Sequence, residues 1–166
     1  YSQGFSPKVR LNLASALPLG FTSTAEMMDF WLEEHMEPSL IQQQLNSALP
    51  TGIRILSVTK VPNDLPSLQA SLKAAEYKVS FKAGVDVSAV CANLEELLNE
   101  PNLIVTRRNK QFDLKPLVEA MQWEEDMLYL RLSNRPEASA RPDELLALLG
   151  LAPEQYDIQR IGLYFS

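Results

Sequence analysis

Apolar and polar residues alternate over several short stretches of the chain, and this is the pattern that a half-buried β-strand produces. In the first part the alternation covers residues 9–13, 27–32 and 53–58. A helix is predicted over 38–49, because apolar residues recur there at helical spacing after Pro38. The predicted order in this part is therefore strand, strand, helix, strand.

The second part, from residue 76 on, shows a similar alternation, and Val and Leu recur at helical spacing over two longer stretches. Strands are predicted over 76–82, 103–107, 127–132 and 157–165, and residues 112–122 form an extended stretch interrupted at Pro116. Helices are predicted over 87–98 and 142–151. The order is strand, helix, strand, strand, helix, strand.

The opening segment is the most distinctive part of the sequence. The sequence predicts a loop shaped by glycine and proline over Tyr1-Ser2-Gln3-Gly4-Phe5-Ser6-Pro7-Lys8, followed by a strand and by a turn at Leu17-Pro18-Leu19-Gly20. From residue 1 to 20 the chain resembles the radical SAM-linked family, bacterial domains of unknown function fused to the C-terminus of B12-binding radical SAM proteins or encoded beside them. The family commonly has Asn at Ser6 and His-Pro at Lys8-Val9, so this chain lacks that histidine.

The resemblance also bears on the fold, because family members usually carry a strand and a helix before this loop. With those two elements the first part would have the same order as the second, and that order is the ferredoxin-like one. We therefore expect an α+β protein of two ferredoxin-like units, each an antiparallel sheet with helices on one face. The units would span 1–62 and 76–166, with a linker over 63–75. The first unit lacks its opening strand and helix, which favours a homodimer that covers the exposed apolar face.

Composition limits the chemistry that this chain can perform. Cys91 is the only cysteine, so the chain forms no internal disulfide, and it cannot supply the three or four thiolates that an iron–sulfur cluster requires. His35 is the only histidine and is expected in an exposed turn, while Cys91 is expected to be buried. No metal or cofactor is therefore expected in this chain. No apolar run approaches the ~20 residues of a membrane span, so a cytoplasmic protein without a membrane partner is predicted.

Two segments are candidates for substrate binding. The opening loop combines aromatic rings that can stack on bases, a glycine that lets the backbone approach a ligand, and cations; single-stranded RNA is commonly bound by such groups. Its candidate residues are Tyr1, Ser2, Gln3, Gly4, Phe5, Pro7, Lys8 and Arg10. The alternative is a structural loop with Phe5 packed as a plug. The second segment is the basic run of Arg107, Arg108 and Lys110, which could contact phosphate from a hairpin tip or simply keep a turn solvated.

Two functions stay open at this point, and neither includes a catalytic residue in this chain. The first is an accessory domain that recognises or presents the substrate of a radical SAM, B12-binding partner, in the same polypeptide or from an adjacent gene, with RNA as one candidate substrate. The second is a protein–protein interaction module with no substrate of its own. The formal charge of −6 weighs against a dominant nucleic-acid role. Convergence of the candidate cations on one groove would favour substrate binding, whereas scatter would favour scaffolding.

Overall fold

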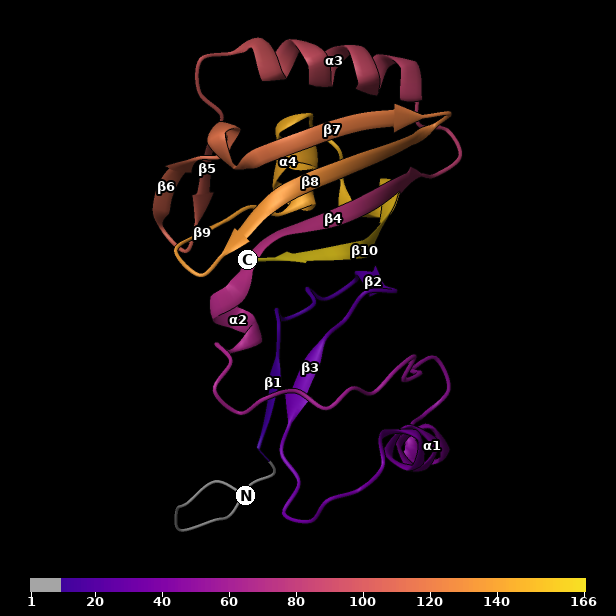
Figure 1. The fold of residues 1–166 in the computed structure, drawn as a ribbon. Helices are drawn as coiled ribbons and strands as arrows, with labels where there is room; N and C mark the ends of the chain where they lie inside the picture. Colours follow the sequence, from indigo (N-terminus) through magenta and orange to yellow (C-terminus); the bar gives the residue numbers. More distant parts are fainter. Residues whose placement is uncertain (1–9) are drawn as a thin grey trace.

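The computed structural model describes residues 10–166, so the candidate residues Tyr1, Ser2, Gln3, Gly4, Phe5, Pro7 and Lys8 lie outside the described part. Its largest element is a six-stranded sheet, shown in the upper half of Figure 1. The strand path is β2–β10–β4–β8–β7, and β9 pairs with β8. The strands are β2 (Thr22–Ser23), β4 (Leu72–Phe81), β7 (Val118–Glu124), β8 (Met127–Arg135), β9 (Ala138–Ser139) and β10 (Tyr156–Phe165). All neighbours are antiparallel except β2, which runs parallel to β10.

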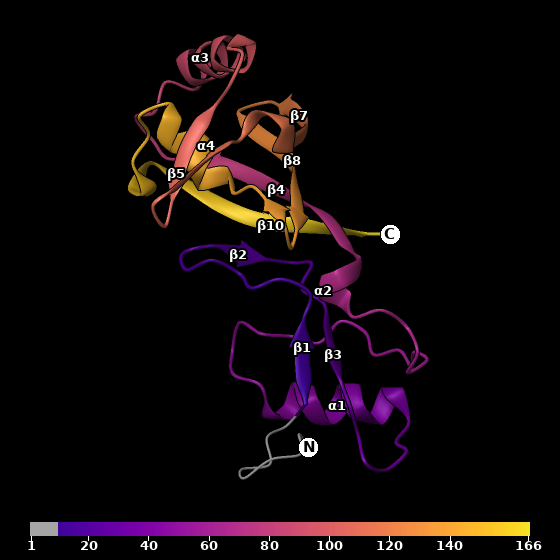
Figure 2. The same cartoon turned by 90° about the vertical axis from the view of Figure 1, so that its left-hand side faces the viewer.

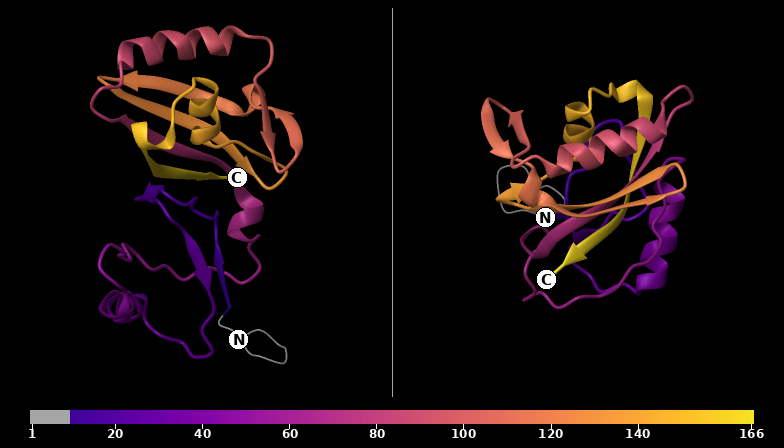
Figure 3. Two further views of the ribbon diagram at one scale, coloured as in Figure 1. Left: turned by 180° about the vertical axis from the view of Figure 1, so that it is seen from behind. Right: turned by 90° about the horizontal axis from the view of Figure 1, so that it is seen from above.

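Two helices cover one face of this sheet, α3 (Val87–Asn99) and α4 (Pro142–Leu148). Both lie behind the sheet in Figure 1, as the side and rear views show (Figures 2 and 3). None of the helices in residues 10–166 covers the opposite face. A separate hairpin of β5 (Ile104–Arg107) and β6 (Lys110–Asp113) packs on the helical face, and 3-10 turns follow at η1 (Lys115–Leu117) and η2 (Pro153–Gln155).

The hydrophobic core lies between the sheet and these helices, and it explains the alternation seen in the sequence. In β8 every second residue points inward, so that Leu128, Leu130 and Leu132 are fully buried. Opposite them, the helices contribute Leu94, Leu145 and Leu146. The hairpin adds Leu103, Val105 and Leu114 to the same core. The mixed α+β class that the sequence predicts is confirmed.

Several predicted boundaries need correction. The strand expected over 76–82 begins earlier, at Leu72, directly after the short helix α2 (Leu68–Ser71). The strand expected over 103–107 pairs only with β6, because the two-residue turn at Arg108-Asn109 folds the chain back on itself. The extended stretch over 112–122 is split by η1 around Pro116, whose ring cannot donate a ladder hydrogen bond.

The described residues before β4 contain few buried side chains. They form a short antiparallel pair, β1 (Leu11–Leu13) with β3 (Met28–Phe30), and the helix α1 (Pro38–Ala48), which stand below the main sheet in Figure 1. Among residues 10–67, only Ala14 and Ile41 are buried apolar residues. This part of the chain therefore lacks a core of its own.

The strand predicted over 53–58 is wrong. The backbone there pairs with side chains of α1 instead of a neighbouring strand: Ile55 N–H donates to Asn46 Oδ1 at 2.8 Å. Asn46 Nδ2 in turn donates to Ile55 O at 3.0 Å, and Gln42 Nε2 donates to Leu56 O at 2.7 Å. Side-chain amides thus satisfy the backbone groups that a sheet neighbour would otherwise occupy.

One buried arginine joins the N-terminal segment to the main sheet. Arg160 of β10 is 1% exposed, and its Nη1 lies 2.9 Å from Glu26 Oε1. The same guanidinium donates to the backbone carbonyls of Ser15 at 3.2 Å and Ala16 at 3.0 Å. These contacts hold the residues around β2 against the edge of β10, where Thr22 and Ser23 pair with Gln159 and Arg160.

A bilayer crossing needs a long apolar helix, and none of the helices within residues 10–166 meets that requirement.

Candidate functional site

The β5–β6 hairpin carries the basic run that the sequence singles out. Arg107 pairs with Lys110 across the hairpin, so Arg108 and Asn109 make a two-residue turn. Their φ angles are 49° and 65°, in the left-handed region that such turns require. Asparagine tolerates this region well, but arginine seldom adopts it, so the turn holds Arg108 in an uncommon conformation.

The base of the hairpin is fixed to the rest of the domain. Leu103 and Val105 are buried in the core, at 2% and 8% exposure. The carboxylate of Asp113 accepts the backbone N–H of Leu103 at 2.8 Å and that of Lys115 at 3.0 Å. Because both ends of the hairpin are anchored, its tip has a defined position.

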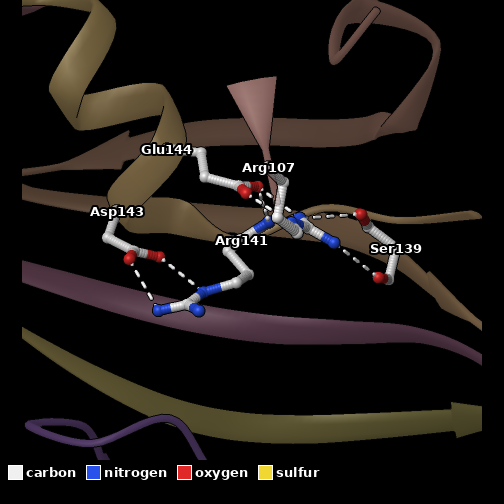
Figure 4. Close-up of polar contacts among 5 residues, drawn as sticks. All are labelled: Arg107, Ser139, Arg141, Asp143 and Glu144. Atoms are coloured by element: carbon white, nitrogen blue, oxygen red, sulfur yellow. Dashed lines mark hydrogen bonds and ion pairs between the residues drawn. The ribbon is translucent and has the colours of Figure 1, made fainter. Parts of the chain in front are cut away.

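Arg107 does not point into solvent but binds the start of α4 (Figure 4). Its Nε and Nη2 donate to the two carboxylate oxygens of Glu144 at 2.6 and 2.5 Å. Its Nη1 and Nη2 also donate to Ser139, to Oγ and to the backbone carbonyl, both at 3.1 Å. The hydrogen bonds that Arg107 donates to Glu144 raise the pKa of the Arg107 guanidinium above its ordinary value. We call this set of contacts the Arg107 brace.

The Glu144 carboxylate, which accepts the hydrogen bonds of this brace, also bonds to the backbone at the start of α4. Glu144 Oε2 accepts the backbone N–H of Arg141 at 3.2 Å, which satisfies one of the donors left free at a helix N-terminus. The Arg141 side chain forms a bidentate pair with Asp143 instead (Figure 4). Its Nε donates to Asp143 Oδ1 at 3.0 Å and its Nη2 donates to Oδ2 at 2.7 Å. Two arginine–carboxylate pairs therefore lie side by side at the start of α4, and neither arginine is left unpaired for a ligand.

Arg108 and Lys110 remain at the tip. Both are exposed, as are Asn109 and Gln111 beside them. Within residues 10–166, neither side chain has a hydrogen-bond or ion-pair partner. We call residues 108–110 the hairpin tip. Of the three hairpin cations that the sequence selected, the structure thus leaves two available and uses the third as a brace.

Arg10 lies in another part of the molecule. Its guanidinium carbon sits 3.9 Å from the centroid of the Trp31 ring, a cation–π contact. Its backbone carbonyl accepts the N–H of Trp31 at 3.3 Å, which extends the β1–β3 pair by one residue. Figures 1 and 2 both place the β1–β3 pair far from the β5–β6 hairpin. Arg10 therefore does not share a groove with Arg108 and Lys110.

The remaining candidate side chains have ordinary environments. His35 is exposed in the loop before α1, which confirms that prediction. Cys91 was expected to be buried but is half-buried, and its Sγ lies 3.9 Å from Glu95 Oε1 on the next turn of α3. In the part of the chain that the structure describes, no three His, Cys, Asp or Glu side chains gather closely enough to hold a metal ion.

The chain was also compared with known proteins. Residues 1–142 match the model of a family described as "Uncharacterized protein conserved in bacteria (DUF2344)". The chain belongs to this family. Comparisons with curated proteins and with solved structures gave no significant match. The description of DUF2344 names a bacterial distribution and no activity.

The DUF2344 match extends from the opening loop to the first residue of α4, so it includes Arg107 and Ser139 but ends before Glu144. Sequence reasoning missed the partnership of Arg107 with Glu144. One signal was present: Arg141-Pro142-Asp143-Glu144 places a glutamate three residues after a helix boundary, where its side chain commonly turns back to the backbone. Nothing in the sequence pairs that glutamate with an arginine 37 residues earlier.

Proposed function

We propose that this DUF2344 chain is a non-catalytic accessory domain that works with a radical SAM enzyme of the B12-binding class and recognises or presents its substrate. The partner would be part of the same polypeptide or the product of an adjacent gene. The sequence resemblance over residues 1–20 suggests this partner. The proposal includes a cytoplasmic location and no cofactor bound by this chain, and it takes RNA as the first substrate class to test.

The observation that supports an accessory role most strongly is the distribution of exposed apolar side chains. Among residues 10–166, fourteen large apolar residues are exposed, and eleven of them lie between Leu11 and Leu65. They include Leu56 at 70% and Ile53 at 58% exposure, while only Ile104, Leu148 and Tyr164 lie elsewhere. A single exposed leucine is ordinary, but a large exposed apolar area is typical of a protein-binding surface, and this stretch supplies most of the exposed apolar side chains among residues 10–166. We call this set the 11–65 surface.

We also propose that the second part, predicted over 76–166 and beginning at Leu72 where β4 starts, forms a ferredoxin-like unit. Of the linker predicted over 63–75, only residues 63–71 then precede that unit. The strand order β10–β4–β8–β7, together with helices α3 and α4 between the strands in sequence, supports this proposal. The β5–β6 hairpin would then be an insertion between the first helix and the second strand. A ferredoxin-like unit over residues 1–62 stays a proposal, and it is weakened because residues 53–58 form no strand and hydrogen-bond to side chains of α1 instead.

A specific observation also favours the second candidate, an interaction module with no substrate of its own. The candidate cations do not gather: Arg10 lies on Trp31, and Arg107 is paired with Glu144. If the partner alone binds the substrate, this chain would serve only to hold it in place. Both candidate functions require the 11–65 surface, but only the first requires that this chain itself bind a substrate.

The proposed partnership can be tested by measuring direct binding. The chain and the radical SAM protein of the same bacterium are purified separately, and their affinity is measured by biolayer interferometry. We expect specific binding that Ile53→Gln combined with Leu56→Gln weakens at least roughly tenfold, because hot-spot apolar side chains dominate protein interfaces. Both residues are exposed, so the fold should be unaffected.

The matched control replaces exposed apolar residues outside the 11–65 surface, Ile104→Gln with Leu148→Gln, at 53% and 37% exposure. We expect this variant to keep wild-type affinity. Failure of the wild-type chain to bind the radical SAM protein would overturn the proposed partnership. Equal losses in both variants would assign the binding to general hydrophobicity and overturn the role of the 11–65 surface.

A further inference from the structure

We propose that the hairpin tip binds the phosphodiester backbone of a nucleic acid strand through Arg108 and Lys110, with the Arg107 brace holding the tip in place. This inference rests on the proposed role in substrate recognition, and it identifies the contact point and the chemical group that is bound. It separates the three hairpin cations into two that touch the ligand and one that positions them.

The charge around the tip is opposite to that of the whole chain. Residues 102–118 contain four cations, Arg107, Arg108, Lys110 and Lys115, and a single carboxylate, Asp113. That carboxylate is turned inward, where it accepts two backbone N–H groups. Between Ile104 and Phe112 there is no acidic residue at all. A local cationic element on an acidic protein attracts a polyanion to one place and repels it elsewhere.

The other two cations of this region already have hydrogen-bond partners within the protein, so the cations available to a phosphate are those of the hairpin tip. Arg107 is bound by Glu144 and Ser139, and Lys115 Nζ donates to the backbone carbonyl of Glu100 at 2.6 Å. Arg108 and Lys110 have no such partner among residues 10–166. An unpaired guanidinium and ammonium, separated by one asparagine, are therefore the groups left to bind an anion.

The geometry presents these groups in advance of binding. The left-handed turn at Arg108-Asn109, the buried base of the hairpin and the Arg107 brace all limit movement of the tip. A preorganised donor loses less conformational entropy on binding than one in a mobile loop. An uncommon backbone conformation at an exposed cation is also typical of functional sites.

The side chains beside the cations favour a nucleic acid over a membrane. Thr106, Asn109 and Gln111 are exposed and offer neutral donors and acceptors, the groups that accompany Arg and Lys in phosphate and sugar contacts. No apolar side chain projects from residues 106–111, so the tip has nothing to insert into a lipid layer.

The test measures binding of a fluorescently labelled single-stranded RNA to the full chain by anisotropy, over a series of KCl concentrations. Unlabelled RNA and DNA strands of the same sequence and a poly-glutamate peptide compete in parallel. For Arg108→Ala with Lys110→Ala we expect roughly a tenfold or greater loss of affinity at low salt. We also expect a salt slope reduced by about one to two, since each lost phosphate contact removes about 0.7 from the slope for a single strand.

The matched control removes the same charge elsewhere, with Arg54→Ala and Lys60→Ala, both exposed. We expect this variant to bind RNA within about twofold of wild type. Arg107→Met should weaken RNA binding with a smaller change in salt slope than the tip variant, because it displaces the tip without removing a phosphate contact. Preferential competition by RNA assigns the strand as RNA, and equal competition by DNA assigns the phosphodiester backbone alone.

Three results would overturn the inference: no RNA binding by the wild-type chain, equal loss in the tip variant and its control, or competition by poly-glutamate as strong as that by RNA. The tip variant is also tested for binding to the radical SAM protein, which we expect to be unchanged. Failure of the hairpin inference is therefore distinguishable from failure of the proposed partnership.

Discussion

The Arg160 guanidinium and the Glu26 carboxylate form an ion pair at 2.9 Å between residues 134 positions apart in the sequence. Arg160 is buried, whereas the Glu26 side chain is one-third exposed. The same guanidinium donates to the backbone carbonyls of Ser15 and Ala16, so this side chain, together with the pairing of β2 and β10, joins the N-terminal segment to the main sheet.

This ion pair yields the first prediction. Glu26→Ala should lower the free energy of unfolding by about 2–4 kcal/mol, because it leaves a buried arginine without its counter-charge. Arg160→Met should cost at least as much, since it also leaves the carbonyls of Ser15 and Ala16 unbonded. Urea denaturation measures both changes.

The control for this prediction is the exposed pair of Lys82 and Asp157, whose side chains are 49% and 69% exposed. Asp157→Ala should change stability by less than about 1 kcal/mol, because water screens an exposed pair. If Glu26→Ala cost no more than Asp157→Ala, the Arg160–Glu26 contact would not be the link that joins the two parts.

The second prediction concerns the Arg107 brace. Glu144→Ala removes the acceptor for the Arg107 side chain and for the backbone N–H of Arg141, so we expect a loss of about 1–3 kcal/mol in unfolding free energy. Hydrogen exchange should also accelerate in the hairpin and in the first turn of α4. Asp143→Ala is the matched control, because it breaks only the adjacent Arg141 pair and leaves the hairpin contacts intact. Equal exchange rates in the hairpin of both variants would contradict the brace.

The third prediction is a loss of stability at alkaline pH. Burial raises the pKa of Tyr77, and the hydrogen bond that the Tyr164 hydroxyl donates to Glu76 raises the pKa of Tyr164. A raised pKa in the folded state means that the stabilisation is present at neutral pH and is lost as the pH rises through that pKa. The free energy of unfolding should therefore fall above about pH 10, the ordinary tyrosine pKa.

The variant that isolates this effect is Tyr77→Phe, which keeps the ring and removes the ionisable hydroxyl. It should show a smaller alkaline loss than wild type in denaturant titrations at about pH 7 and pH 11, while phenolate absorbance follows the ionisation. An alkaline loss identical to that of wild type would show that Tyr77 does not contribute.

The fourth prediction concerns self-association in the absence of a partner. The 11–65 surface exposes Leu11 at 47% and Leu13 at 44% on one short strand pair, so we expect the purified chain to associate, most simply as a dimer. Leu11→Gln with Leu13→Gln should shift light-scattering mass toward the monomer with little change in melting temperature. A wild-type chain that stays monomeric at micromolar concentration would contradict this prediction.

The sequence predicted the second part of the chain better than the first. Alternation in residues 127–132 and helical spacing in 87–98 each corresponded to a real element, because the two faces of these elements have different environments. The core between sheet and helices produces that difference. Where such a core exists, periodicity locates most strands and helices, but their ends and their pairing partners still differ from the prediction.

The sequence-based predictions are wrong where the choice of hydrogen-bonding neighbour determines whether a segment becomes a strand. Residues 53–58 alternate as a strand does, yet Asn46 and Gln42 take the backbone hydrogen bonds of Ile55 and Leu56. The two residues of β2 carry no strand pattern and still pair with β10. Periodicity reports which side of a segment is apolar, but it does not identify the neighbour that receives its hydrogen bonds.

The candidate site shows the same limit. The sequence located the basic run at residues 107–110 and its position in a hairpin, and the structure has that hairpin. It gave no indication that Arg107 would turn toward Glu144 while Arg108 and Lys110 stayed exposed. That difference depends on the side of the hairpin that packs against α4, which only the assembled fold determines.

The parallel pairing of β2 with β10 has a consequence for how the protein is made. During translation, residues 10–67 leave the ribosome exit tunnel well before Gln159 and Arg160 are synthesised. The early segment therefore emerges before β10, the strand against which β2 packs, exists. During that interval its leucines and methionines are open to other nascent chains, and closing so long a loop is slow. Chaperones that shield apolar segments during translation would thus be needed most by the first third of this chain.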